Sequence, residues 1–261
     1  MEEVFEVSFF YFKLFMMSKY LLLISNSTNP GEAYLEWPQS YISQFLSKTV
    51  VRRILFIPFA GVNLTTEGIN PSYKIYTEKV QKVFNNLGYE VYSIVNEEDP
   101  IKAVEDAECI MVGGGNTFFL VYMLYKWKLM EPIRRKILVG IPYIGWSAGS
   151  NVACPSLGTT NDMPIVEPES FKTFNVIPFQ INPHYLDTHS TEHGGETREQ
   201  RIMEFLAVNP LVKIVGLRER TAFLVEGEKI ELIGSRSMRY FEFAQEPKEF
   251  QPGDDLEILM H

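Results

Sequence analysis

The sequence contains few cysteines and histidines, and this scarcity excludes several kinds of site. Its 261 residues include 2 cysteines and 4 histidines. Cys109 and Cys154 each lie in or beside an apolar run, and no CxxC or mixed Cys/His ligand spacing is present. We therefore expect neither a metal site nor a disulfide framework, and a reducing cytoplasm is the natural compartment.

Positive charge is scarce as well. Lys and Arg number 24 against 33 Asp and Glu, which gives a formal net charge of -9 at pH 7. No stripe of basic residues with interleaved aromatic side chains occurs along the chain. The composition thus argues against a nucleic-acid partner and is otherwise that of a globular protein.

The N-terminal residues lack the features of a secretory signal. Val4–Met17 is apolar and aromatic, but acidic Glu2 and Glu3 precede it, and no small-residue cleavage site is present. The stretch is also too short to span a bilayer, so we predict no membrane association. We expect residues 1–16 to be an extra strand or a poorly ordered leader, and residues 17–261 to form a single domain.

Short apolar runs alternate with amphipathic segments through the first two thirds of the chain. Val80, Val83, Phe84 and Leu87 share the spacing of one helical face. Apolar strands that alternate with helices predict a doubly wound, mostly parallel α/β sheet covered on both faces. The expected strands are Tyr20–Ile24, Ile54–Phe59, Glu90–Val95, Cys109–Gly115, Ile141–Trp146 and Val176–Asn182.

The last part of the chain has a different pattern, with short strands and tight turns. We expect these strands to form an antiparallel extension at one edge of the sheet. They are predicted at residues 222–227, 229–235, 238–243 and 256–261.

The segment "GWSAG" places Ser147 in a G-x-S-x-G pattern at the end of an expected strand. This pattern is typical of a nucleophilic serine on a strained strand-to-helix turn, where glycines allow close backbone approach. The N–H of Ala148 would then point toward the carbonyl that the serine attacks. A Gly-rich turn with an inert serine is the alternative.

A second glycine cluster, "VGGGNT", follows another expected strand and opens a helix. In a parallel sheet it would lie at the same edge as Ser147, where the N–H of Gly115 could be the second oxyanion donor. A phosphate-binding loop is the rival interpretation. It is disfavoured because Phe118 interrupts G-x-G-x-x-G and no Walker lysine follows.

A serine nucleophile needs a base. His184 directly follows the run "FQINP", at the exit of an expected strand, whereas His189 and His193 lie in a polar stretch and His261 is terminal. His184 is therefore the favoured base.

The orienting carboxylate should also come from a strand end. Glu219 follows the apolar run "KIVGL" and is the natural candidate, with Asp162 and Asp187 as rivals. The resulting order of serine, histidine and glutamate differs from that of α/β-hydrolases, in which the histidine comes last.

Several motifs, taken together, resemble the peptidase E family of α-aspartyl dipeptidases. The resemblance runs from about residue 17 to about residue 234. The motifs that carry it, in chain order, are "SNSTNPGEAYLE", "FIPFAGV", "VGGGNTF", "YIGWSAGSNVACP", "TTNDMPIV", "QINPH" and "GETREQRI".

The resemblance implies a serine peptidase with the flavodoxin-like fold shared by class I glutamine amidotransferases. It implies cleavage of small acidic dipeptides with an N-terminal aspartate, with no metal or cofactor, by a cytoplasmic monomer or homodimer. The triad would be Ser147, His184 and Glu219, and Gly115 and Ala148 would supply the oxyanion N–H groups.

Substrate recognition follows from the same resemblance. Arg198 would clamp the substrate carboxylate, a role that its planar guanidinium suits, and Asp162 would help to hold the ammonium. The sequence departs from the expected Pro-Glu-Gly-like turn, because Arg218 and Arg220 flank Glu219. A relative acting on another acidic peptide or polymer, and a non-catalytic aspartyl-ligand binding protein, are the alternatives.

Overall fold

The computed structural model describes residues 19–187 and 195–261, so the expected leader, residues 1–16, lies outside the described residues. The main sheet has the order β3-β2-β4-β5-β1-β8-β9. The strands from β3 to β1 run parallel, and β8 and β9 extend the sheet in the antiparallel sense. These strands are β1 (Tyr20–Ile24), β2 (Arg53–Ile57), β3 (Glu90–Ser93), β4 (Ile110–Val112), β5 (Tyr143–Trp146), β8 (Thr221–Glu226) and β9 (Lys229–Gly234).

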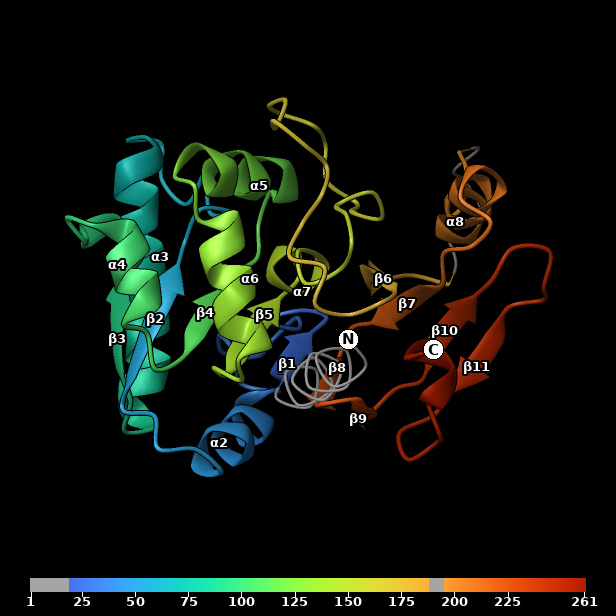
Figure 1. The fold of residues 1–261 in the computed structure, drawn as a ribbon, viewed down its shortest axis with the longest axis horizontal. Helices are drawn as coiled ribbons and strands as arrows, with labels where there is room; N and C mark the ends of the chain where they lie inside the picture. Colours follow the sequence, from blue (N-terminus) through green and yellow to red (C-terminus); the bar gives the residue numbers. More distant parts are fainter. Residues whose placement is uncertain (1–18, 188–194) are drawn as a thin grey trace, which may run out of the picture.

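Both faces of the main sheet are buried because alternate residues of its apolar strands point to opposite sides. Leu21 and Leu23 of β1 pack in one core cluster, and Leu22 and Ile24 pack in another. Helices α4 (Pro100–Glu105), α5 (Thr117–Lys126) and α6 (Met130–Leu138) contribute to the first cluster, and α2 (Gln39–Ser47) and α3 (Ile69–Asn86) to the second. This is the predicted doubly wound α/β architecture (Figure 1).

A second sheet, of order β11-β10-β7-β6, lies at the other end of the molecule (Figure 1). Its strands are β6 (Gln180–Tyr185), β7 (Ile214–Arg218), β10 (Met238–Phe241) and β11 (Lys248–Phe250), and β6 and β7 pair in parallel. Helix α8 (Arg198–Val208) packs on this sheet through Ile202 and Leu206. The strand expected from Val176 therefore begins later, at Gln180, and belongs to this sheet.

The C-terminal strands differ from the prediction in two respects. They do not all extend one edge, because β8 and β9 join the main sheet whereas β10 and β11 join the second. The predicted strand over residues 256–261 was wrong, since a 3-10 helix, η2 (Glu257–Leu259), forms there. Leu256 and Leu259 are both buried at a spacing of three residues, which suits a 3-10 turn rather than the alternation of a strand.

Two short helices complete the described elements: η1 (Ile94–Asn96) and α7 (Ala148–Asn151). Helix α7 follows β5 directly, and α5 begins shortly after β4. Because β4 and β5 are parallel neighbours, both glycine-rich connections leave the same edge of the sheet. No helix of the described residues has the length and apolar character needed to cross a membrane.

Candidate active site

Ser147 lies on the predicted strained turn between β5 and α7. Its backbone has φ 54 and ψ -112, a conformation that non-glycine residues rarely adopt and that clusters at functional sites. A Cβ on Gly145 would lie 2.4 Å from the carbonyl oxygen of Gly149, and one on Gly149 would lie 2.1 Å from that of Val112. Both glycines of the motif are therefore required by close backbone packing, and they hold the serine above the sheet edge.

The loop that follows β4 lies directly against this turn. Gly115 has φ 133, and a Cβ there would lie 2.1 Å from the carbonyl oxygen of Ala60. The amide of Asn116 donates to that same carbonyl, at 2.9 Å. Within the described residues, the N–H groups of Gly115 and Ala148 have no hydrogen-bond acceptor, so both remain available for a developing oxyanion.

The hydroxyl of Tyr76, on α3, fixes the glycine loop. It donates to the carbonyl of Gly114 at 3.0 Å and accepts from the indole N–H of Trp146 at 3.0 Å. Burial raises the pKa of Tyr76 to about 12, so the phenol stays neutral and keeps its donor proton. Tyr76 thus links the strand that carries Ser147 to the loop that carries Gly115.

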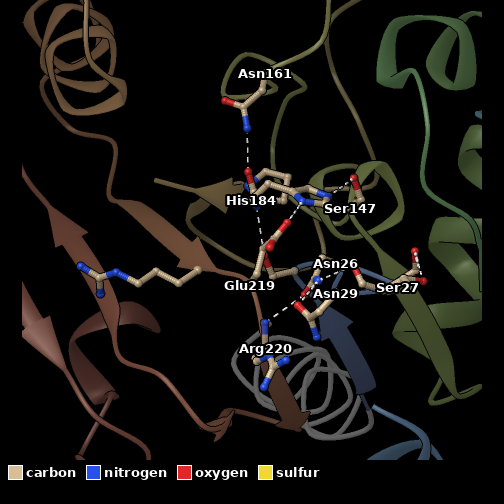
Figure 2. A network of polar contacts seen from close by, with 12 residues as sticks. Asn26, Ser27, Asn29, Ser147, Asn161, His184, Glu219 and Arg220 are labelled. Atoms are coloured by element: carbon tan, nitrogen blue, oxygen red, sulfur yellow. Dashed lines mark hydrogen bonds and ion pairs between the residues drawn. The ribbon is translucent and has the colours of Figure 1, made fainter. Parts of the chain in front are cut away.

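His184 lies within 3.1 Å of Ser147, measured from Nε2 to Oγ (Figure 2). It is the penultimate residue of β6 rather than a residue beyond its end, and the register between β6 and β7 shifts between Pro183 and Tyr185. One extra residue on one strand forms a bulge, which re-aims a side chain. His184 has φ 52 at this bulge.

The bulge is held by the hydroxyl of Ser25, a fully buried residue after β1. Ser25 Oγ accepts from the backbone N–H of His184 at 3.0 Å and donates to the carbonyl of Leu217 at 2.7 Å. One side chain therefore satisfies two backbone groups of the second sheet next to the imidazole. Ser25 fixes the backbone from which His184 extends.

Glu219 lies in the two-residue connection between β7 and β8. Its Oε1 is 2.8 Å from Nδ1 of His184, on the ring side opposite Ser147 (Figure 2). The side chain of Glu219 is 34% exposed, so this carboxylate is not fully withdrawn from water. Serine, imidazole and carboxylate form one continuous chain of polar contacts.

The unexpected arginines around Glu219 have separate roles. Arg218 is buried and binds Asp187 and Glu249, and hydrogen bonds from Arg218 lower the pKa of both carboxyls. Arg220 adopts φ 65, a left-handed conformation in which a glycine would be unstrained. The side chain of Asn26 accepts the N–H of Arg220 at 2.9 Å, which stabilises the turn without a glycine.

The rival residues have other partners, and Asp162 is bound to Thr117 rather than to His184. Asp187 is bound to Arg218, and His261 lies beside Glu257, at 3.4 Å. His189 and His193 lie outside the described residues.

Asp162 and Arg198 share a cavity of about 830 Å³ with Ser147 and His184. Arg198 is the first residue of α8, and its Nη1 donates to the side chain of Asn161. Its Nε is buried without a hydrogen-bond partner among residues 19–187 and 195–261. Burial, together with the nearby Arg201, lowers the pKa of Arg198, so an anion in the cavity would be bound favourably.

Asp162 is held at the N-terminus of α5. Its Oδ2 accepts from the N–H and the hydroxyl of Thr117, both at 2.6 Å, and from the hydroxyl of Thr160 at 3.0 Å. A carboxylate is stabilised at a helix N-terminus, so part of its role is to anchor α5. These contacts use one carboxylate oxygen, and the residue lines the cavity.

Sequence reasoning missed the residues that support the site: Ser25, Asn26, Tyr76 and Asn161. Ser25 and Asn26 could have been found, since they are polar residues directly after an apolar parallel strand. Tyr76 and Asn161 have no comparable signal, because tyrosine and asparagine are ordinary in helices and loops. In the part of the chain that the structure describes, no cluster of three or more metal-ligating side chains occurs.

Comparison with known proteins identifies the family of this chain. The model of peptidase family S51 matches residues 21–233. The chain is 49% identical over 244 residues to peptidase E of a Nostoc species, across 94% of this chain and 98% of that protein. It is 41% identical over 239 residues to peptidase E of Shewanella amazonensis, across 92% and 98%.

A solved structure shares the fold. The crystal structure of a peptidase from an acI-B1 actinobacterium superposes with a TM-score of 0.67 at 16% sequence identity, and the match covers 94% of this chain and 98% of that chain. The chain belongs to peptidase family S51 and is a peptidase.

Proposed function

We propose that this member of peptidase family S51 is a serine peptidase that hydrolyses Asp-Xaa dipeptides through an acyl-enzyme. One observation carries the proposal: the continuous contact from Ser147 Oγ through the imidazole of His184 to the carboxylate of Glu219, at 3.1 Å and 2.8 Å. A hydroxyl beside an imidazole that is itself oriented by a carboxylate is the arrangement that nucleophilic acyl transfer needs.

In the first step, Ser147 Oγ attacks the carbonyl carbon of the aspartyl residue, and His184 Nε2 takes the hydroxyl proton. Glu219 keeps the Nδ1 proton of His184 directed toward itself and stabilises the imidazolium that forms. The free N–H groups of Gly115 and Ala148 donate hydrogen bonds to the developing oxyanion.

In the second step, the tetrahedral intermediate collapses, and His184 gives its proton to the leaving amine as the C–N bond breaks. Water, deprotonated by the same imidazole, then attacks the ester on Ser147. Aspartate leaves, and the serine recovers its proton from His184. Atoms and charges balance without any further reactant.

Specificity for an N-terminal aspartate follows from Arg198 and Asp162. The guanidinium of Arg198 is partly buried and has an unpaired Nε–H, which suits a bidentate bond to the aspartyl side chain. Asp162 lines the same cavity and offers a negative charge to the substrate ammonium. The charge of each side chain is thus opposite to that of the substrate group that we assign to it.

The mechanism is tested with aspartyl p-nitroanilide and a fluorophosphonate probe. Ser147→Ala should lower kcat by at least about 10⁴-fold and abolish labelling. Ser40→Ala, which changes an exposed serine of α2, should leave both unchanged. Hydrolysis that survives in Ser147→Ala at near wild-type rate would reject the serine mechanism.

Specificity is tested with the aspartyl, glutamyl, asparaginyl and leucyl p-nitroanilides. The aspartyl substrate should be hydrolysed fastest, and Arg198→Met should remove most of its advantage over the asparaginyl one. Arg201→Met is the matched control, because Arg201 lies one turn further along α8 and is well exposed. Equal rates on all four substrates would reject the aspartate preference, and activity on N-terminally blocked acidic peptides would favour a polymer substrate.

A further inference from the structure

The cavity contains a cation that the proposed reaction does not yet use. Apart from the imidazole of His184, the residues lining the cavity that carry a formal charge are Lys79, Asp162 and Arg198. Asp162 and Arg198 have partners in the proposed mode of binding. Lys79, from α3, has none.

Lys79 is held by a ring contact and not by an ion pair. Its Nζ lies 4.1 Å from the centroid of the Tyr34 ring, a cation–π contact. Among residues 19–187 and 195–261, no carboxylate lies within ion-pair distance of it, whereas Lys74 on the same helix is 4.0 Å from Glu78. The Lys79 ammonium is thus positioned at the cavity with its hydrogen-bonding capacity unused by a carboxylate.

The ring beneath Lys79 belongs to the active site. Tyr34 packs edge-on against Tyr76 and Trp146, with centroid distances of 6.5 Å and 6.4 Å. Trp146 directly precedes Ser147, and Tyr76 holds the oxyanion loop. The same aromatic cluster therefore positions both the nucleophile and the Lys79 ammonium.

Lys79 and Arg198 come from opposite sides of the nucleophile. In Figure 1, α3 and α8 lie on either side of α7, the helix that begins directly after Ser147. Since both residues line one cavity, a bound peptide that reaches Arg198 with one end extends across Ser147 toward Lys79.

We propose that Lys79 binds the C-terminal carboxylate of the dipeptide and thereby selects substrates of two residues. This inference rests on the proposed function. An Asp-Xaa dipeptide carries a side-chain carboxylate, an ammonium and a terminal carboxylate, and the cavity offers Arg198, Asp162 and Lys79, each of opposite sign. In a longer peptide, a neutral amide replaces the carboxylate that Lys79 would bind.

The experiment compares Asp-Leu with Asp-Leu amide, which lacks the terminal charge, in wild type and in Lys79→Met. Methionine keeps an unbranched stem over Tyr34 while removing the ammonium. The wild type should prefer Asp-Leu by about tenfold in kcat/KM, the contribution of one hydrogen bond to a charged group. Lys79→Met should lose that preference because kcat/KM falls for Asp-Leu and stays the same for Asp-Leu amide. Lys79→Arg should retain most of the preference.

Lys82→Met is the matched control, since Lys82 is an exposed lysine three residues further along α3. It should retain the wild-type preference for Asp-Leu. Equal losses on both peptides in Lys79→Met would overturn the proposal, as would no loss on either. Hydrolysis of aspartyl p-nitroanilide, which has no terminal carboxylate, should be unchanged in Lys79→Met and reports separately on the catalytic machinery.

Binding to a Ser147→Ala protein, followed by calorimetry, decides the question without catalysis. Asp-Leu should bind about tenfold more tightly than its amide, and the difference should vanish when Lys79→Met is added. If the wild type hydrolyses no aspartyl substrate but the binding difference is present, the proposed function fails while the role of Lys79 stands. Equal binding of the two peptides would reject that role.

Discussion

Replacing Ser25 with alanine tests how much the position of the His184 imidazole matters, without changing the imidazole itself. In the described structure, the hydroxyl of Ser25 bonds to neither Ser147 nor Glu219, the proposed nucleophile and carboxylate. Its hydroxyl joins the N–H of His184, at 3.0 Å, to the carbonyl of Leu217, at 2.7 Å, in a fully buried position. Ser25→Ala therefore removes the anchor of the β6 bulge and leaves the three side chains of the triad intact.

The magnitude follows from the two hydrogen bonds that are lost. Leaving a buried backbone donor and acceptor unpaired costs about 1 to 3 kcal/mol each, so the free energy of unfolding should fall by about 2 to 6 kcal/mol. A displacement of the imidazole by about 1 Å costs about 100-fold in rate. We expect kcat for Asp-Leu to fall by about that factor while KM changes little, because Arg198 and Asp162 are untouched.

The assay measures kcat and KM for Asp-Leu at a temperature where circular dichroism shows Ser25→Ala to be folded. Ser93→Ala is the control, since Ser93 is a buried serine on the edge strand β3, and it should leave kcat unchanged. A destabilised Ser25→Ala protein with wild-type kcat would refute the positioning role. So would a rise in KM that accounts for the whole loss.

Two further predictions concern the charged groups around the triad. Glu219→Gln should lower kcat for aspartyl p-nitroanilide by about 10²-fold. The expected loss is smaller than the 10⁴-fold known for a buried triad aspartate, because the side chain of Glu219 is 34% exposed. A loss below about fivefold would contradict the proposal that Glu219 orients His184. Arg218→Met should lower the free energy of unfolding at pH 7 by about 2 kcal/mol, since it removes the ion pair of Asp187 and leaves Glu249 with its longer contact to Arg239, at 3.8 Å. The lowered pKa values of Asp187 and Glu249 mean that their contribution is complete above about pH 4.5 and is lost as the pH falls through the folded-state pKa. Thermal unfolding from pH 7 to pH 2 should thus show a weaker acid dependence in Arg218→Met than in wild type, and equal slopes would refute the pairing.

The main sheet could be predicted because its strands are short, apolar on both faces and separated by helices of clear periodicity. Leu21, Leu22 and Leu23 are all buried, so the run has no alternation, which is typical of a parallel strand between two helical layers. Ser147 could be predicted for a related reason. Its turn requires glycine at positions 145 and 149, so the constraint can be recognised from five consecutive residues.

The second sheet was not predictable from local pattern. β6 and β7 pair in parallel although 28 residues separate Tyr185 from Ile214, and nothing in either run specifies that partner. The same limit applies to the bulge at His184, because its register depends on Ser25, which is distant in sequence. The nearness of His184 to Ser147 could be predicted from its place at the end of a strand, whereas the contact that fixes its backbone could not.

The order of serine, histidine and glutamate follows from how the two sheets meet. Ser147 follows β5 of the main sheet, His184 lies on β6 of the second, and Glu219 occupies the two-residue connection by which the chain passes from β7 back to β8. That connection is tied to the main sheet by Asn26, which accepts the N–H of Arg220. The contacts among the three side chains therefore depend on how both sheets are placed. In this chain the carboxylate comes last because β7, the parallel neighbour of the strand that carries His184, follows that strand in sequence and leads directly into the connection to β8.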